Sequence, residues 1–386
     1  MKGSITVCAV GDVFVEREQP ASMFTAVAPL FEGGDIKFGN CEGAYTRTPA
    51  RPPSAAHMVV SGPANITGLS EVGFDVMACA NNHFVDGGHS AMLETLDRLK
   101  ALGIATVGAG ADLSGAHRPA RLERNGVAVE VLAYTCVHPA GYEARMGVPG
   151  LATLRVLTHY WADPLFWNPG MQPEIATFAT QSALETLRTD VGAARSRADV
   201  VMVSFHWGDS SRPVKLQDYE MQLGRAAVDA GADVVLGHHH HCLRGVELYL
   251  GKPILYGLGS FAFDLRDIEK RFSQDALRKM RERNGDYAFG LREGYPSFPF
   301  HPEYRQTVLA RIVLVPKQEP EVTLVPCMVR PAGHPEPLPR GSAEAARWAE
   351  YMSKITVAEG FTTQYEPSSV ANYAQHAALR VGRAGA

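Results

Sequence analysis

The sequence predicts an α/β protein, because apolar segments of strand length recur along the chain and segments of helical pattern lie between several of them. Many of the apolar segments are continuous and do not alternate with polar residues, which is typical of strands covered on both faces. The 386 residues, 46% of them hydrophobic, fit one large domain with a substantial core. Size and composition are therefore compatible with an enzyme.

The expected elements follow in chain order. The first apolar run, 5–10, is followed directly by Gly11 and Asp12, so it indicates a core strand and not the apolar region of a signal peptide. Further strands are expected at 36–39, 74–80, 104–107, 127–134, 200–205, 234–237, 246–250, 254–257 and 308–315. Helices are expected at about 90–102, 174–197, 216–230, 267–283 and 343–355.

Two long connections, about 137–173 and 265–305, carry aromatic residues and several prolines. Connections of this length are uncommon unless they form lids or binding loops. We interpret them as walls of a substrate site, with Trp161 and Trp167 as candidate contacts, while packing or oligomer contacts are the alternative. The main domain is expected to span 1–339, with 340–386 as a C-terminal extension that docks on it.

Charge and cysteine usage narrow the class of protein. Lysine and arginine total 37 against 41 acidic residues, a net charge of −4, which disfavours binding to nucleic acid. The six cysteines are dispersed without a Cys-x-x-Cys pair, as expected for free thiols in a reducing compartment. No apolar window of about 18 residues predicts a membrane span. We expect a cytoplasmic protein whose oligomeric state the sequence leaves open.

Polar residues of metal-binding types follow five of the expected strands. They are Asp12, Glu42, Asn82 with His83, His206, and the run His238, His239, His240 and His241. Ligands bind beyond the carboxyl ends of strands in α/β sheets, so these side chains can converge there. Each one alone has an ordinary explanation, such as a cap, an Asx turn or a core histidine. Their shared position indicates one site.

The donor set indicates which ions this site would take. Two carboxylates, one amide and at least three histidines suit Mn²⁺, Fe or Zn²⁺, and they do not suit Ca²⁺, which prefers oxygen alone. The set is also too large for one four-coordinate structural zinc. We therefore predict a site for two divalent transition metals, roughly 3.5–4 Å apart.

Six motifs lie in order between residue 5 and about residue 264. They are Gly11-Asp12, Asn40-x-Glu42, Ala80-Asn81-Asn82-His83-x-x-Asp86-x-Gly88, His206-Trp207-Gly208, Gly237-His238-His239-x-His241 and the segment 251–264. This pattern resembles the CapA family of bacterial poly-γ-glutamate capsule synthesis proteins, in the calcineurin-like metallophosphoesterase superfamily. The resemblance implies a two-sheet β-sandwich flanked by helices, an αββα arrangement.

Carried over residue by residue, the resemblance implies a ligand set in which Glu42 bridges two metals. The first metal would be held by Asp12, Glu42 and His241, and the second by Glu42, Asn82, His206 and His239. The His-x-His spacing that ends the pattern also fits His238 and His240. We prefer His239 and His241, because the family usually has proline where this chain has His240.

The resemblance also implies a proton donor. His83 would be free of metal and act as a general acid for a leaving group, or stabilise developing charge. Asp86 would accept the other ring N–H of His83 and fix its tautomer.

The chain departs from the wider pattern at three places. The superfamily opens with Asp-x-His, whereas this chain has Phe14 at the third position, which leaves the first metal one imidazole short. Ser260 stands where the family usually has asparagine. Capsule proteins of this family are commonly membrane anchored, and the absence of an N-terminal anchor here favours a soluble pathway over an envelope role.

The leading hypothesis is a soluble dinuclear enzyme whose metal-activated water attacks a phosphoester, or an amide or γ-glutamyl bond, in a small-molecule or peptide-like substrate. One alternative keeps the metals as Lewis acids of a biosynthetic cyclase, lyase or ligase. Another is a non-catalytic accessory subunit of poly-γ-glutamate capsule synthesis. Trp207 and His238 join Trp161 and Trp167 as candidate substrate contacts, with core packing as the alternative for the tryptophans.

Overall fold

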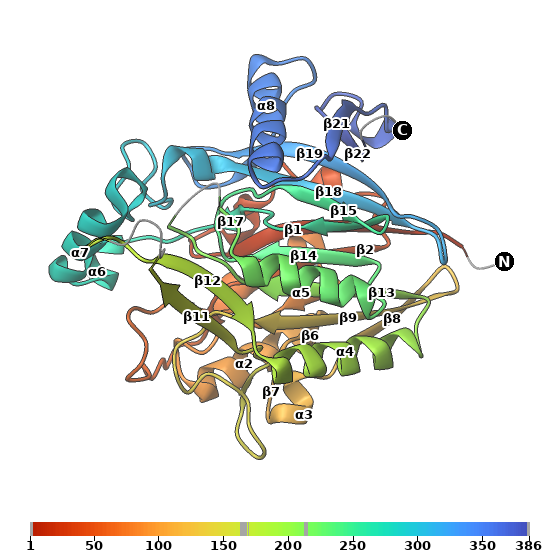
Figure 1. Cartoon of the computed structure of the whole chain (residues 1–386). Coiled ribbons are helices and arrows are strands. Elements are labelled where there is room, and N and C mark those ends of the chain that lie inside the picture. Colours follow the sequence, from red (N-terminus) through yellow and green to blue (C-terminus); the bar gives the residue numbers. More distant parts are fainter. Residues whose placement is uncertain (1–2, 163–167, 169, 212–214, 384–386) are drawn as a thin grey trace.

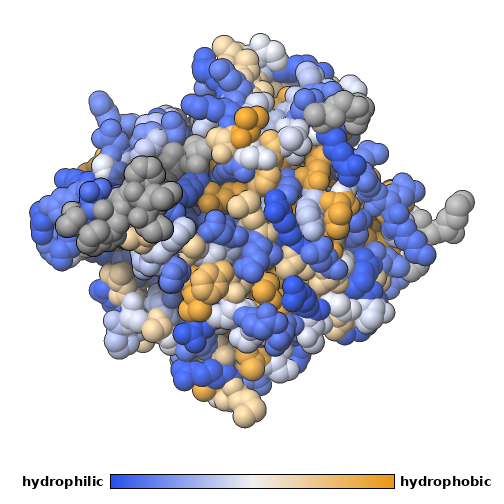
Figure 2. Space-filling model, viewed as in Figure 1, coloured by the Kyte–Doolittle hydropathy of each residue, from blue (hydrophilic) through white to orange (hydrophobic). Residues whose placement is uncertain are grey.

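The computed structural model describes residues 3–162, 168, 170–211 and 215–383, and it confirms the α/β class (Figure 1). Two large sheets, of ten and six strands, make up most of the fold. Several helices lie on their outer faces (Figure 1), and the molecular surface seen in Figure 2 mixes hydrophilic and hydrophobic residues. The carboxyl ends of the central strands carry the predicted site.

The ten-stranded sheet is built around β1 (Ile5–Phe14). β1 pairs in parallel with β2 (Ile36–Cys41) and β17 (Ser260–Phe263), and antiparallel with β18 (Gln306–Leu314). The strand order is β21 (Gln364–Pro367), β22 (Leu379–Gly382), β19 (Glu321–Val329), β18, β1, β2, β5 (Val76–Ala78) and β6 (Ala105–Val107), and β20 (Pro335–Pro337) pairs with β19.

The six-stranded sheet has a parallel centre. Its order is β15 (Val246–Tyr249), β16 (Lys252–Leu255), β14 (Val234–His238), β13 (Val200–His206), β9 (Val127–Thr135) and β8 (Ala120–Arg124). The four inner strands run parallel, and the two edge strands pair antiparallel with their neighbours.

Side chains alternate between two cores along each inner strand. Met202 of β13 shares a buried cluster with Val7 of β1, so one core lies between the two sheets. Val203, the next residue of β13, packs in a second core with α4 (Gln181–Arg195) and α5 (Asp218–Asp229). Figure 1 shows these two helices side by side over the six-stranded sheet. A third core lies under α1 (Gly68–Val72) and α2 (His89–Ala101) on the ten-stranded sheet.

Smaller elements complete the described part of the chain. Two-stranded sheets are formed by β3 (Ala44–Tyr45) with β4 (Val60–Ser61), β7 (Ala109–Gly110) with β10 (Gly150–Leu151), and β11 (Val156–Trp161) with β12 (Glu174–Ala179). The short helices are α3 (Leu113–Ala116), α6 (Ile268–Arg271) and α7 (Gln274–Asn284). Among the described helices, none has the length and apolar character needed to cross a bilayer.

The expected helix at 174–197 is wrong in its first part. Residues 174–179 form β12, whose β-branched and aromatic side chains pair with β11 in a hairpin. Helix α4 begins only after Thr180, whose hydroxyl accepts a hydrogen bond from the Ala183 N–H at 3.2 Å. The expected helix at 267–283 is likewise divided, because Ser273 caps the start of α7 in the same way.

The last part of the chain contacts the main fold through two elements. In α8 (Ala343–Ala358), Trp348 is buried in the core between the sheets, and its indole N–H donates to the Thr307 carbonyl at 3.2 Å. Strand β22 pairs antiparallel with β19 and so extends the ten-stranded sheet. The boundary between residues 339 and 340 stays a prediction.

Candidate metal centre

The predicted metal ligands lie together where the carboxyl ends of the two sheets meet. Asp12 lies near the end of β1, and Glu42 directly follows β2. His206 ends β13, and His239 and His241 lie in the turn after β14. All five side chains are buried. The parallel pairing of β1 with β2, and of β13 with β14, delivers them to one place.

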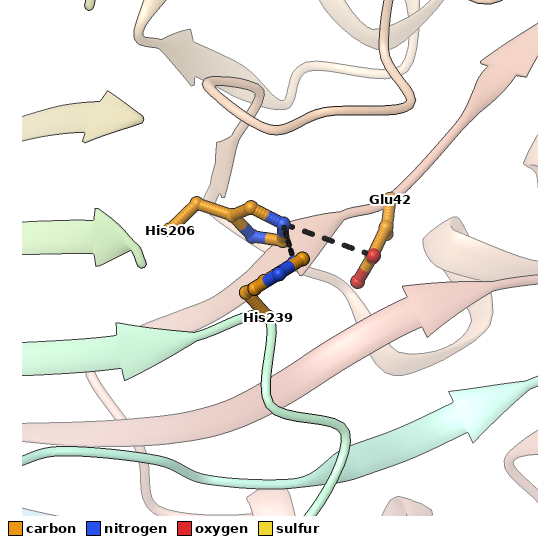
Figure 3. A group of neighbouring side chains, drawn as sticks. All are labelled: Glu42, His206 and His239. Carbon is orange, nitrogen blue, oxygen red and sulfur yellow. Dashed lines mark hydrogen bonds and ion pairs between the residues drawn. The ribbon is translucent and has the colours of Figure 1, made fainter. Parts of the chain in front are cut away.

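Two groups of candidate ligands share Glu42. In the first, His241 Nδ1 lies 3.3 Å from Asp12 Oδ2, and His241 Nε2 lies 3.4 Å from Glu42 Oε1. In the second, His206 Nε2 lies 3.1 Å from His239 Nδ1 and 3.8 Å from Glu42 Oε1 (Figure 3). The three donor atoms of each group lie within 4.8 Å of one another. One ion could therefore contact all three donors of a group.

Asn82 adjoins the second group. Its Oδ1 lies 2.6 Å from His206 Nε2, and its Nδ2 lies 3.0 Å from His83 Nε2. Unlike the other predicted ligands, Asn82 is only half-buried. The second group therefore has a fourth donor and a side that reaches solvent.

Asn40 orients both carboxylates. Its Nδ2 donates to Asp12 Oδ1 at 2.9 Å and lies 3.5 Å from Glu42 Oε2. Asn81 in turn holds Asn40, through a 3.2 Å hydrogen bond to its Oδ1. The opposite carboxylate oxygens, Asp12 Oδ2 and Glu42 Oε1, are buried without a hydrogen bond. Buried carboxylate oxygens are costly unless a donor or a cation faces them, so this donor set fits divalent metal ions.

The electrostatics of the cluster suit metal binding. Burial would raise the pKa of Asp12, but the neighbouring imidazoles hold that pKa well below its usual value. Burial, followed by the charge of Asp12, raises the pKa of Glu42 well above its usual value. Burial lowers the pKa of His206 and His239 well below that of a free imidazole, which keeps both rings in the neutral form that binds metals. A cation beside Glu42 would favour its ionised form.

The four consecutive histidines point in different directions. The groups that share Glu42 contain His239 and His241, which have φ angles of 91° and 58°. Such angles are unfavourable for residues with a Cβ and persist only where the surroundings fix them. His240 is directed away from Glu42, and its Nε2 lies 2.7 Å from Glu220 Oε1. His238 is buried with Nδ1 3.5 Å from Asp12 Oδ1, a position that lends its predicted substrate contact no support.

His83 and Asp86 lie beside the centre in a hydrogen-bonded chain. His83 Nδ1 is 2.8 Å from Asp86 Oδ2, which also accepts the Val59 N–H at 2.8 Å. Asp86 Oδ1 accepts the hydroxyl of Tyr142 at 2.8 Å. Asp86 thus fixes the ring of His83, and His83 Nε2 is directed toward Asn82. The catalytic roles of His83 and Asp86 stay predictions.

Aromatic residues of the 265–305 connection cover the centre. The ring of Phe300 lies 4.5 Å from the ring of His241, between centroids. Phe272 lies 4.2 Å from His57, which in turn lies 4.8 Å from His83. This connection therefore shields both the first ligand group and His83 from water.

A cavity of about 530 Å³ is lined by Gly208 and Asp209, which follow His206 by two and three residues, and by none of the candidate ligands. Its walls include Tyr160 of the β11–β12 hairpin and Arg283 at the end of α7. Trp161 is not among the lining residues, because successive strand residues point to opposite faces, and it is 47% exposed. Trp167 lies outside the described residues.

Trp207 lies in the core and not on the cavity wall. Its ring stacks 4.5 Å from that of Phe205, and its indole N–H donates to the Tyr256 carbonyl at 2.9 Å. Trp207 has no exposed surface, so it agrees with core packing, the alternative to a substrate contact.

Three residues around the site were not singled out from the sequence. Asn40 and Asn81 lie inside the motifs Asn40-x-Glu42 and Ala80-Asn81-Asn82-His83, so their spacing was a usable signal. Glu220 lies on α5, outside every motif, and only the fold brings it to His240.

Fold and site together define an α/β protein with two groups of potential metal ligands that share one carboxylate. The chain belongs to the family described as bacterial capsule synthesis protein PGA_cap, whose sequence model matches residues 6–265. The resemblance to CapA proteins is thereby confirmed.

Two relatives have names that refer to the synthesis of an amino-acid polymer. "PGA biosynthesis protein CapA" of Bacillus subtilis (strain 168) is 31% identical over 66% of this chain and 62% of its own length. "Probable polyglutamine synthesis accessory protein Rv0574c" of Mycobacterium tuberculosis (strain ATCC 25618 / H37Rv) is 32% identical over 53% of this chain and 50% of its own. The chain thus spans less than two thirds of the length of either relative.

A comparison with solved structures adds little. The chain titled "GAP50 the anchor in the inner membrane complex of Plasmodium" aligns over 84% of this chain and 85% of its own. The TM-score is 0.27 and the sequence identity 10%, so this likeness carries no argument.

Proposed function

We propose that this chain is a dinuclear metal-dependent hydrolase with a metallophosphoesterase-type sandwich, acting on a phosphoester, or on an amide or γ-glutamyl bond. The observation that carries the proposal is Glu42 Oε1, a buried oxygen without a hydrogen bond that belongs to both ligand groups. A carboxylate shared in this way suits a site that holds two metal ions close together. The core between the two sheets supports the proposed sandwich.

In this proposal, Asp12, Glu42 and His241 hold one ion, and Glu42, Asn82, His206 and His239 hold the other. Bound divalent ions would lower the pKa of a bridging water toward neutrality and polarise the electrophile. Asn40 holds Asp12 Oδ1 and lies near Glu42 Oε2, which would leave the opposite oxygen of each carboxylate available to an ion. Mn²⁺, Fe and Zn²⁺ all suit these donors.

His83 supplies the proton in this proposal. Its Nδ1 is held by Asp86, and its Nε2 faces Asn82 Nδ2 at 3.0 Å, so the protonated ring would deliver the Nε2 proton to a leaving group that takes the place of this contact. The nearby aromatic residues Phe272 and Phe300 limit the access of bulk water. We place the substrate in the cavity beside Gly208, which follows the candidate ligand His206 by two residues.

The test is a hydrolysis screen with metal-stripped protein reconstituted with Mn²⁺, Zn²⁺ or Fe²⁺. Substrates would be p-nitrophenyl phosphate, bis(p-nitrophenyl) phosphate and γ-glutamyl p-nitroanilide. We expect metal-dependent turnover of at least one of them, lost in His239→Ala and kept in His376→Ala, a histidine far along the chain in the C-terminal region. Metal-bound protein that turns over none of these substrates would count against the hydrolase.

The word "accessory" in the name of the mycobacterial relative favours a second candidate, a non-catalytic accessory protein of poly-γ-glutamate synthesis. This candidate predicts that the chain binds an oligo-γ-glutamate and releases no product from it. Binding that persists in His239→Ala, with no turnover in the wild type, would favour it over the hydrolase.

A further inference from the structure

His240 is the member of the histidine run that points toward a neighbouring helix. Its Nε2 lies 2.7 Å from Glu220 Oε1 of α5, and both side chains are fully buried. The residues on either side of it, His239 and His241, belong to the two ligand groups. The contact between His240 and Glu220 therefore lies at the middle of the ligand-bearing turn.

The backbone around this turn needs support. His239 and His241 both have positive φ angles, which side chains with a Cβ rarely adopt, so the turn would relax if its surroundings released it. Neither residue is a glycine, so the backbone freedom of glycine does not explain these angles. Something outside the turn must hold it, and the buried contact of His240 is placed to do so.

Gly208 leaves room for the contact between His240 and Glu220. Gly208, two residues after the candidate ligand His206, has a φ of 86°, and a Cβ at this position would collide with His240 Nε2 and lie 2.8 Å from Glu220 Oε1. Only glycine therefore lets the ring of His240 reach the helix. The segment 206–208 thus provides both a candidate ligand, His206, and the space for the contact between His240 and Glu220.

Glu220 is itself fixed at its other oxygen. Glu220 Oε2 accepts the N–H of Gln217 at 2.7 Å, as part of a capping box at the start of α5. The helix is anchored in turn by buried residues such as Leu223 and Ala227, which pack in the core outside the six-stranded sheet. Glu220 is thus a rigid support.

We infer that Glu220 is a positioning residue for the metal centre: through His240 it holds the turn so that His239 and His241 both face Glu42. This inference rests on the two-metal site of the proposed function. Residues that orient ligands from behind typically change metal affinity by roughly 10–100-fold when removed. Glu220 would touch neither metal nor substrate.

The test is titration of metal-stripped protein with Mn²⁺, followed by electron paramagnetic resonance, which reports free Mn²⁺ and the spin coupling of a Mn²⁺ pair. We expect Glu220→Leu to weaken binding of both ions by roughly 10–100-fold and to change the coupled spectrum. Glu220→Gln keeps one acceptor oxygen where Glu220 uses two, so both readouts should lie between those of Glu220→Leu and of the wild type. Asp218→Asn, at the start of the same helix, is the matched control and should bind Mn²⁺ as the wild type does.

A second variant tests the contact from its other end. His240→Ala removes the contact with Glu220 without changing a residue of α5. It should weaken Mn²⁺ binding as Glu220→Leu does. Because both substitutions act through one contact, the double variant should bind Mn²⁺ no more weakly than either single variant. This variant also keeps the inference testable if Glu220→Leu does not fold.

Several outcomes would overturn the inference. Wild-type affinity in Glu220→Leu, or additive losses in the double variant, would show that the contact does not position the ligands. Complete loss of one ion in His240→Ala alone would make His240 a ligand. Two ions bound by the wild type without turnover would defeat the proposed hydrolase and leave this inference intact, whereas no binding at all would overturn both.

Discussion

The two ligand groups around Glu42 differ in donors and in surroundings. The first, with Asp12 and His241, offers two carboxylates and one imidazole and lies beneath Phe300. The second, with His206 and His239, offers two imidazoles and one carboxylate, and Asn82 adds a fourth donor on a half-exposed side. An ion held by four donors should bind more tightly than one held by three. In the proposed centre, the ion of the second group should therefore bind first and the ion of the first group after it.

Phe14 explains why the first group is short of a donor. The superfamily pattern places a histidine at this position, two residues after the aspartate. Here Phe14 is fully buried and lies 5.8 Å from the rings of both Tyr45 and Phe263. Phe14 therefore serves packing, and in the proposed centre the first ion would depend on Asp12, Glu42 and His241.

The largest effect should come from Glu42→Ala, because this residue belongs to both groups. We expect metal content, measured by elemental analysis, to fall from about two ions to none. Hydrolytic activity should fall by roughly 10³-fold or more. Glu366→Ala, which removes a carboxylate from an exposed ion pair with Arg380, is the control and should keep both ions. Retention of either ion at wild-type affinity in Glu42→Ala would contradict a shared ligand.

The next pair of variants separates the groups. His241→Ala should lose the more weakly held ion, and His239→Ala the more tightly held one, so each should keep one ion per chain. Stepwise Mn²⁺ titration of the two variants would measure the affinity that remains. If both variants lost the same ion, the division into two groups would be wrong.

His83→Ala should lose catalysis without losing metal. Because His83 is placed as the proton donor and lies outside both ligand groups, kcat should fall by roughly 10²–10⁴-fold while two ions remain bound. The kcat of Asp86→Asn should also fall, but by less, because Asp86 orients the ring of His83 and does not carry the proton. The substitution also alters the hydrogen bonds of Asp86 with Val59 and Tyr142, so metal content is measured alongside. A loss of metal in His83→Ala that matches the loss of activity would make His83 a ligand.

The smallest effect is expected at the cavity. Tyr160→Ala should raise KM by roughly 3–10-fold, equal to the loss of one modest contact, because Tyr160 lines the cavity. Trp161→Ala should leave KM unchanged, since this neighbour points to the other face of the hairpin. The reverse order of effects would mean that the substrate approaches from the side of Trp161.

The predictable part of the fold was the set of buried strands. Continuous apolar runs mark β1, β9, β13 and β14, because parallel strands covered on both faces need apolar residues at every position. The helix expected at 174–197 failed in its first part, because residues 174–179 are stabilised as a strand by pairing with β11, a contact that a local pattern does not contain.

The candidate site shows the same division. Asp12, Glu42 and the histidines could be named from their places after strands, since topology brings strand ends together. The direction of each side chain could not, because it depends on local dihedrals and packing. The opposite faces of Tyr160 and Trp161 are one example. The contact of His240 with Glu220 is another, because only tertiary structure joins them.

The most direct test of the account is Mn²⁺ titration of the metal-stripped wild-type protein, followed by calorimetry and electron paramagnetic resonance. The account predicts two ions per chain, bound in two steps of unequal affinity, with a spin-coupled spectrum once the second step is complete. A single ion, or two ions without spin coupling, would contradict a centre in which Glu42 joins both groups.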